Sequence, residues 1–84
     1  MKRTVSKQKI DLVLKAFQRK REPLSSRAIS ELCWDICNEE ELHNKYKLSS
    51  HEVVAVCHEL SLNKIEDNSQ KGVLWYMENI PQKI

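Results

Sequence analysis

The chain has 84 residues, the size of one small domain, and a chain this short can enclose only a single compact core. Its hydrophobic content of 40% and charged content of 31% are typical of a globular domain. No apolar run approaches the roughly 20 residues that cross a bilayer, so we expect neither a membrane span nor a membrane partner.

The net charge of +2 conceals an uneven distribution along the chain. Residues 1–27 carry nine Lys or Arg against two acidic residues, whereas residues 28–84 carry five Lys against ten acidic residues. Contact with a polyanion, where it occurs, should therefore begin in the N-terminal third.

Two helices are expected in the first half of the chain. Residues 1–5 read as a frayed basic end, Ser6 as the cap of the first helix, and Pro23 as its stop. Ser25 or Ser26 should cap the second helix, and Leu24 is expected to form a short strand between them. The predicted buried positions of the first helix are Ile10, Val13, Leu14 and Phe17, and those of the second are Ile29, Leu32, Cys33 and Ile36.

Residues 48–78 predict a third helix followed by a β-hairpin. Ser49 and Glu52 have the spacing of a capping box, and Leu48 is placed to pack on Val53. Residues 64–67 and 73–78 read as strands, and 68–72 as the turn that joins them. This order predicts a mainly α domain with a small β-hairpin, an α+β winged helix-turn-helix of three helices plus a wing. It should fill residues 1–84 as one domain.

The run from Leu48 to Leu60, followed by a short wing and by Glu78-Asn-Ile-Pro, resembles the C-terminal winged-helix domain of the largest subunit of the origin recognition complex. It is also similar to that domain in the cell-division-cycle replication-licensing ATPase and in the yeast silencing protein derived from the largest subunit. Residues 6–14 fit the first helix of that family, and residues 24–32 fit the second.

The resemblance implies association with chromatin or replication origins, in the nucleus. In that family the domain follows an AAA+ ATPase module, which these 84 residues do not include, so we expect an excised fragment or an isolated domain. The replication members contact DNA and neighbouring subunits through this domain. The silencing member uses it to self-associate.

We expect the third helix to face a polypeptide partner. Its outward face lacks Lys and Arg, which read base edges or contact phosphates, and Glu52 and Glu59 beside it would repel phosphates. Low charge and spare aromatics are typical of the centre of a protein interface. The candidate interface residues are Trp34, His51, Val54, Ala55, His58, Leu62 and Tyr76. The alternative is that the histidines are merely solvated and that Trp34 covers the edge of the core.

The expected partner is a second copy in a two-fold homodimer, or another chromatin or replication protein. Duplex DNA is a further candidate partner, either as an auxiliary contact or, in the alternative function, as the direct ligand of an origin-recognition or replication-licensing complex. The candidate DNA-binding residues are Lys2, Arg3, Lys7, Arg19, Lys20, Arg21, Arg27, Lys64, Asn68, Gln70 and Lys71. The basic residues at the end of the first helix, Arg19, Lys20 and Arg21, are equally consistent with a purely structural role, in which their charges stabilise the negative end of the helix dipole.

Neither catalysis nor a bound cofactor is expected. Cys33, Cys37 and Cys57 are an odd number at helical positions, which favours reduced, buried thiols in an intracellular protein over a zinc site. A phosphate-binding loop needs several glycines, and the chain has only Gly72. No catalytic motif is present, so we expect a non-enzymatic protein without a small-molecule substrate.

Overall fold

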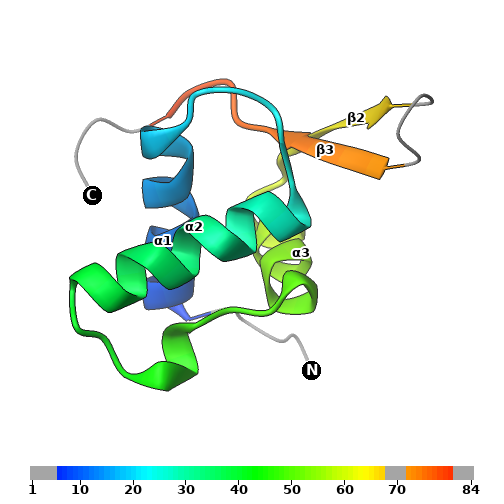
Figure 1. Cartoon of the computed structure of the whole chain (residues 1–84). Helices are drawn as coiled ribbons and strands as arrows, with labels where there is room; N and C mark the ends of the chain where they lie inside the picture. Colours follow the sequence, from blue (N-terminus) through cyan, green and yellow to red (C-terminus); the bar gives the residue numbers. More distant parts are fainter. Residues whose placement is uncertain (1–5, 68–71, 81–84) are drawn as a thin grey trace.

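The computed structural model describes residues 6–67 and 72–80. Figure 1 shows the helices packed together, with a β-ribbon projecting from one side of them. The elements follow in the order α1 (Lys7–Arg19), β1 (Leu24–Ser25), α2 (Ser26–Glu39), the 3-10 helix η1 (Asn44–Tyr46), α3 (Ser50–Glu59), β2 (Asn63–Asp67) and β3 (Gly72–Tyr76). This is a winged-helix arrangement of three helices and a wing, as the sequence predicts.

The helix starts follow the predicted caps. The Ser6 hydroxyl accepts a hydrogen bond of 3.4 Å from the backbone N–H of Lys9, and Ser25 caps α2 by accepting one of 3.1 Å from Ala28. The choice between Ser25 and Ser26 is thus decided for Ser25. At the other end, α1 ends at Arg19, before the expected stop at Pro23, because Lys20 already has an extended backbone.

The predicted capping box opens α3. The Ser49 hydroxyl accepts a hydrogen bond from the backbone N–H of Glu52, whose carboxylate accepts one of 3.2 Å from the Ser49 N–H. Leu48, just before the cap, and Val53 are both fully buried in the core. The cap thus satisfies two of the free N–H groups at the helix start while the apolar residues beside it anchor the chain.

The core lies between the three helices and the inner face of the sheet. The buried face of α1 is rotated relative to the predicted one. Its fully buried residues are Leu12, Val13, Ala16 and Phe17. Ile10 and Leu14, predicted to be buried, are only half-buried at the edge of the core. The reason is that α1 packs against both α2 and α3, so its apolar stripe is centred between them.

The sheet has three antiparallel strands in the order β1-β3-β2. Leu24 pairs with Trp75, which confirms the short first strand. Trp75 and Met77 are buried toward the helices, whereas Tyr76 between them is exposed. Three predicted boundaries are wrong: β2 begins at Asn63 and not at Lys64, Gly72 belongs to β3 and not to the turn, and β3 ends at Tyr76, before Glu78.

Candidate protein-interaction surface

The outward side of α3 carries three exposed residues at helical spacing, His51, Ala55 and His58. The opposite side buries Val53, Val56 and Cys57 completely. Helical periodicity therefore separates the two faces as the sequence predicts. The exposed residues, here called the α3 face, form a narrow surface with a small residue at its centre.

No Lys or Arg lies within α3, and the acidic Glu52 at its start is neutralised from α1. Its carboxylate accepts a hydrogen bond of 3.0 Å from the Lys9 ammonium as well as the capping bond from Ser49. The Lys9 hydrogen bond, followed by the Ser49 N–H, holds the pKa of Glu52 below its ordinary value. The α3 face therefore contains no Lys, Arg, Asp or Glu, and Glu59, next to His58, is an exposed acidic residue beside it.

His58 connects the α3 face to the wing. Its ring meets the Trp75 ring edge-on, with centroids 5.3 Å apart and planes at 83°. The Lys64 ammonium lies 5.5 Å from the centroid of the same Trp75 ring. His58 is thus an exposed residue that also packs against the buried Trp75 ring, so it is not merely solvated.

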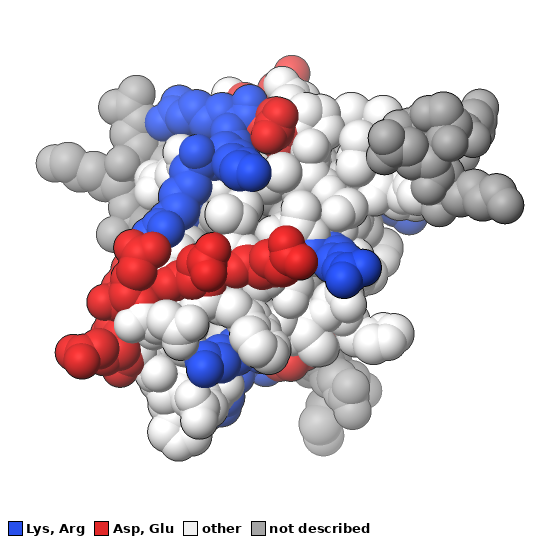
Figure 2. Space-filling model, viewed as in Figure 1, with Lys and Arg blue, Asp and Glu red and all other residues white. Residues whose placement is uncertain are grey.

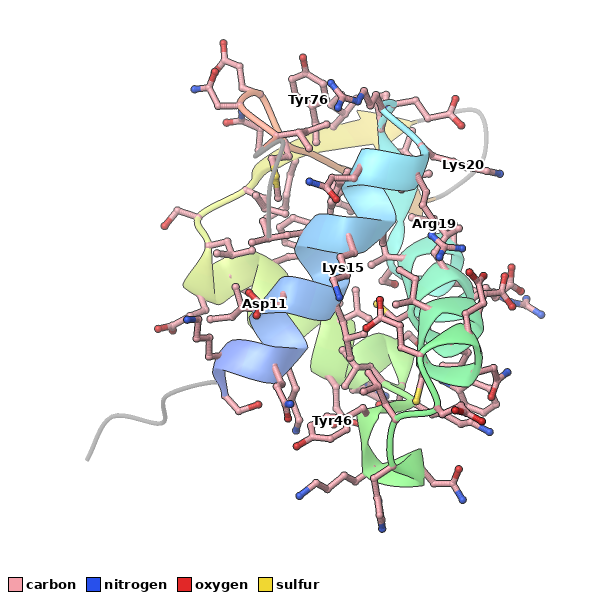
Figure 3. The ribbon with its side chains drawn as sticks, turned by 90° about the vertical axis from the view of Figure 1, so that its left-hand side faces the viewer. Asp11, Lys15, Arg19, Lys20, Tyr46 and Tyr76 are labelled. Carbon is pink, nitrogen blue, oxygen red and sulfur yellow. The ribbon has the colours of Figure 1, made fainter. Side chains whose placement is uncertain are left out.

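The other predicted interface residues do not join the α3 face into one patch. Val54 and Leu62 are half-buried and pack against the core. Tyr76 is 36% exposed on the sheet face opposite Trp75, which points away from the helices. Figure 3 places Tyr76 at one end of the molecule and Tyr46 at the other.

Trp34 lies on a separate surface, the outward side of α2, and is 46% exposed. Its indole Nε1 donates a hydrogen bond of 2.8 Å to the carbonyl of Leu48, and the Lys47 ammonium lies 5.7 Å from its ring centroid. Trp34 therefore neither simply covers the edge of the core nor lies wholly free for a partner. Its N–H is used in a hydrogen bond within the fold, while much of the ring remains exposed.

Two basic side chains of α1 are paired with acidic residues at the C-terminal end of α2. Arg19 makes a two-bond pair with Glu39, with N–O distances of 2.7 and 2.8 Å, and Lys15 binds Glu40 at 2.9 Å. This pairing raises the pKa of Arg19 and lowers that of Glu39. Figure 2 shows acidic groups in a band along α2 with basic groups beside it, and Figure 3 shows Lys15 and Arg19 on the α2 side of α1.

The remaining candidate DNA-binding residues differ in their availability. Arg27 lies 3.9 Å from Glu31 with both side chains largely exposed, which is a weak pair. Among the side chains that the structure describes, those of residues 6–65 and 72–80, no ion pair engages Lys7, Lys20, Arg21 or Lys64, and all four are exposed. Lys2, Arg3, Asn68, Gln70 and Lys71 lie outside the described residues.

The three cysteines are buried, and none of them forms a disulfide. Burial raises the pKa of both Cys33 and Cys57 to about 12, and the Cys37 thiol contacts the carbonyls of Leu42 and His43 at 3.5 Å. Such thiols are poor nucleophiles and poor metal ligands. Across the described part of the chain, no group of three or more His, Cys, Asp or Glu is placed to hold a metal ion.

The wing carries exposed apolar residues that were not predicted from the sequence. Ile65 on β2 is 42% exposed and Val73 on β3 is 38% exposed. The one available signal was a lone Ile between Lys64 and Glu66, which could have indicated an apolar residue on an exposed strand. The sheet order that leaves β2 outside was not readable from the sequence.

None of the helices in the described residues is long and apolar enough to cross a membrane. No protein-family model matches the chain, and searches of curated proteins and of solved structures also return no match. The resemblance carried by residues 48–60 therefore stays a hypothesis about family and context.

Proposed function

We propose that this chain is a non-catalytic winged-helix module that works by protein association, principally with a second copy of itself. Contact with duplex DNA is auxiliary. The observation that carries this proposal is the chemistry of α3, the helix that a winged helix would offer to DNA. Its exposed side presents Ala55 between two histidines and no Lys or Arg.

Electrostatics argue against base reading by this helix. A helix in the major groove usually offers Arg, Lys, Asn or Gln to base edges, and α3 has none of these. Glu59 is exposed there and would repel phosphates. A neutral surface with a small central residue is better matched to another polypeptide, because little charge must be desolvated when it is covered.

A second observation supports association. The exposed large hydrophobic residues of the described chain are Trp34, Ile65, Val73 and Tyr76, and three of these four lie on the β2–β3 ribbon. Apolar side chains gathered on one projecting element are typical of contact surfaces. The α3 face and the ribbon are therefore the two candidate surfaces for a partner chain.

The auxiliary role for DNA rests on the basic residues that α2 does not neutralise. Lys20 and Arg21 follow the end of α1, are exposed, and make no ion pair within the described residues. Such residues favour phosphate contact without sequence preference. Direct duplex reading within an origin-recognition or replication-licensing complex is the alternative function.

The chromatin context, and with it the nucleus, comes solely from the resemblance to the origin-recognition and silencing family, which residues 48–60 carry together with residues 6–14 and 24–32. The proposal for protein association does not depend on it. The chemistry of α3 would favour association over base reading in any cellular compartment.

Sedimentation equilibrium of the 84-residue chain from tens of micromolar upward, beside anisotropy titration of a 20-base-pair duplex, tests this function. These concentrations suit weak self-association. We expect a concentration-dependent dimer and only weak, salt-sensitive DNA binding. A strictly monomeric chain that binds duplex tightly would overturn the proposal in favour of the alternative.

A further inference from the structure

The strand order β1-β3-β2 leaves β2 at the edge of the sheet. β3 pairs with one side of β2 from Asn63 to Asp67, and no described strand pairs with the other side. Figure 1 shows the ribbon of β2 and β3 extending away from the helices. The backbone N–H and C=O groups along an open edge are a template for a further strand.

An exposed apolar residue sits at the middle of this edge strand. Ile65 is 42% exposed although it pairs with Leu74 of β3. The flanking residues alternate in charge, with Lys64 before Ile65 and Glu66 after it. Lys64 and Glu66 can therefore pair with each other when the strand lies antiparallel to a second copy of itself.

We propose that two copies of this chain pair through their β2 edges, antiparallel and centred on Ile65. This inference rests on the proposed function and, of the two candidate surfaces named there, assigns the contact between copies to the ribbon. In this register Lys64 of each copy stands opposite Glu66 of the other, and Asn63 stands opposite Asp67. Ile65 meets its own counterpart at the two-fold axis.

The register follows from strand geometry and charge. Directly opposite residues in an antiparallel sheet share a face, so a two-fold pairing must be centred on a residue and not between two. Centring on Lys64 or on Glu66 would place like charges opposite each other. Centring on Ile65 places opposite charges together twice, and such cross-strand pairs stabilise a sheet.

The same charges explain why the pairing would be selective. Charged residues on an edge strand normally prevent association with other sheets. Here they would repel a strand in the wrong register and attract the self-complementary one. The result is one continuous six-stranded sheet across two copies. A five-residue edge contact is smaller than the roughly 800 Å² per partner of a standard interface, so we expect a weak dimer.

A charge-swap series in the complete 84-residue chain tests the inference. Sedimentation equilibrium from about 10 µM to 1 mM brackets a weak dimer. Lys64→Glu should weaken the dimer about tenfold, because two attractive pairs become repulsive. The double variant Lys64→Glu/Glu66→Lys should restore it to near the parent value.

Lys20→Glu is the matched control, since it makes the same charge change at an exposed residue away from β2 and should leave the dimer unchanged. Circular dichroism establishes that each variant is folded, because Lys64 also lies near the Trp75 ring. Ala55→Arg on the α3 face should also leave the dimer intact.

Specific outcomes would overturn the inference. These are a dimer insensitive to Lys64→Glu, a double variant that does not recover, or a dimer lost in Ala55→Arg. Each of them leaves self-association itself standing. A chain that stays monomeric at 1 mM instead defeats the self-association on which the inference rests.

Discussion

The indole N–H of Trp34 donates a hydrogen bond of 2.8 Å to the carbonyl oxygen of Leu48, which also accepts one of 2.6 Å from the Ser30 hydroxyl. Leu48 immediately precedes the Ser49 cap and is fully buried. Two side chains of α2 therefore fix the point at which α3 begins. The hydrogen bond to Leu48 holds the half-exposed Trp34 ring in a fixed position on the surface.

Replacing Trp34 by Phe keeps an aromatic ring and removes the N–H donor. We expect Trp34→Phe to lower the free energy of unfolding by about 1 kcal/mol, the typical contribution of one hydrogen bond. Urea denaturation at pH 7, followed by circular dichroism, measures the change. Ser30→Ala is the companion variant, and the double variant should show coupling, because both side chains bind the same carbonyl oxygen. Unchanged stability in Trp34→Phe would show that the bond contributes nothing.

The stability of the domain should depend on pH in the acid range through Glu52. Its pKa in the folded chain lies below the ordinary value of 4.5, chiefly because Lys9 donates to its carboxylate. A carboxyl whose pKa is depressed by folding stabilises the fold above the unfolded value and loses that contribution as the pH falls through the folded value. We therefore expect stability to decline from about pH 5 downward.

Glu52→Gln isolates this effect, since Gln still accepts the capping bond from Ser49 but cannot titrate. The Lys9 and Glu52 side chains are 33% and 39% exposed, so the difference in unfolding free energy at pH 7 should be only a few tenths of a kcal/mol to about 1 kcal/mol. Thermal unfolding at pH 7 and pH 3 provides the comparison. The variant should lose less stability between these two pH values than the parent. An equal loss would show that the Glu52 carboxylate does not contribute to the pH dependence of stability.

The buried thiols should be unreactive in the folded domain. Burial raises the pKa of Cys33 and Cys57 to about 12, so only a minute fraction is thiolate at pH 8. We expect a disulfide-exchange reagent to modify the native chain slowly and all three cysteines rapidly after unfolding in guanidinium. Rapid modification of the native chain, without loss of its circular dichroism signal, would contradict this burial.

The basic residues near the end of α1 make distinguishable predictions for DNA binding. Arg21→Gln should weaken binding to duplex DNA and reduce the slope of log affinity against log salt by close to one. Arg19→Gln is the control: because its guanidinium is already held by Glu39, we expect a smaller change in the slope. Anisotropy titrations of one duplex at several salt concentrations give these slopes. Equal binding by the parent and Arg21→Gln would exclude the predicted phosphate contact.

The amino-acid sequence by itself determined the three α-helices, the three strands and their order, but not the 3-10 helix η1. The caps at Ser6, Ser25 and Ser49 act within one helical turn, so their signals are contained in a few neighbouring residues. The exposure of His51 and Ala55 likewise follows from helical periodicity. These features were predictable because local hydrogen bonding and local periodicity produce them.

Only the tertiary structure decided which of these residues act together. The Arg19–Glu39 and Lys9–Glu52 pairs join positions 20 and 43 residues apart, and they neutralise charges that the sequence presents as available. The insertion of β3 between β1 and β2 leaves β2 as an edge, and the opposite faces of β3 separate Trp75 from Tyr76. Such relationships depend on how whole elements pack, and no short window of sequence contains both partners.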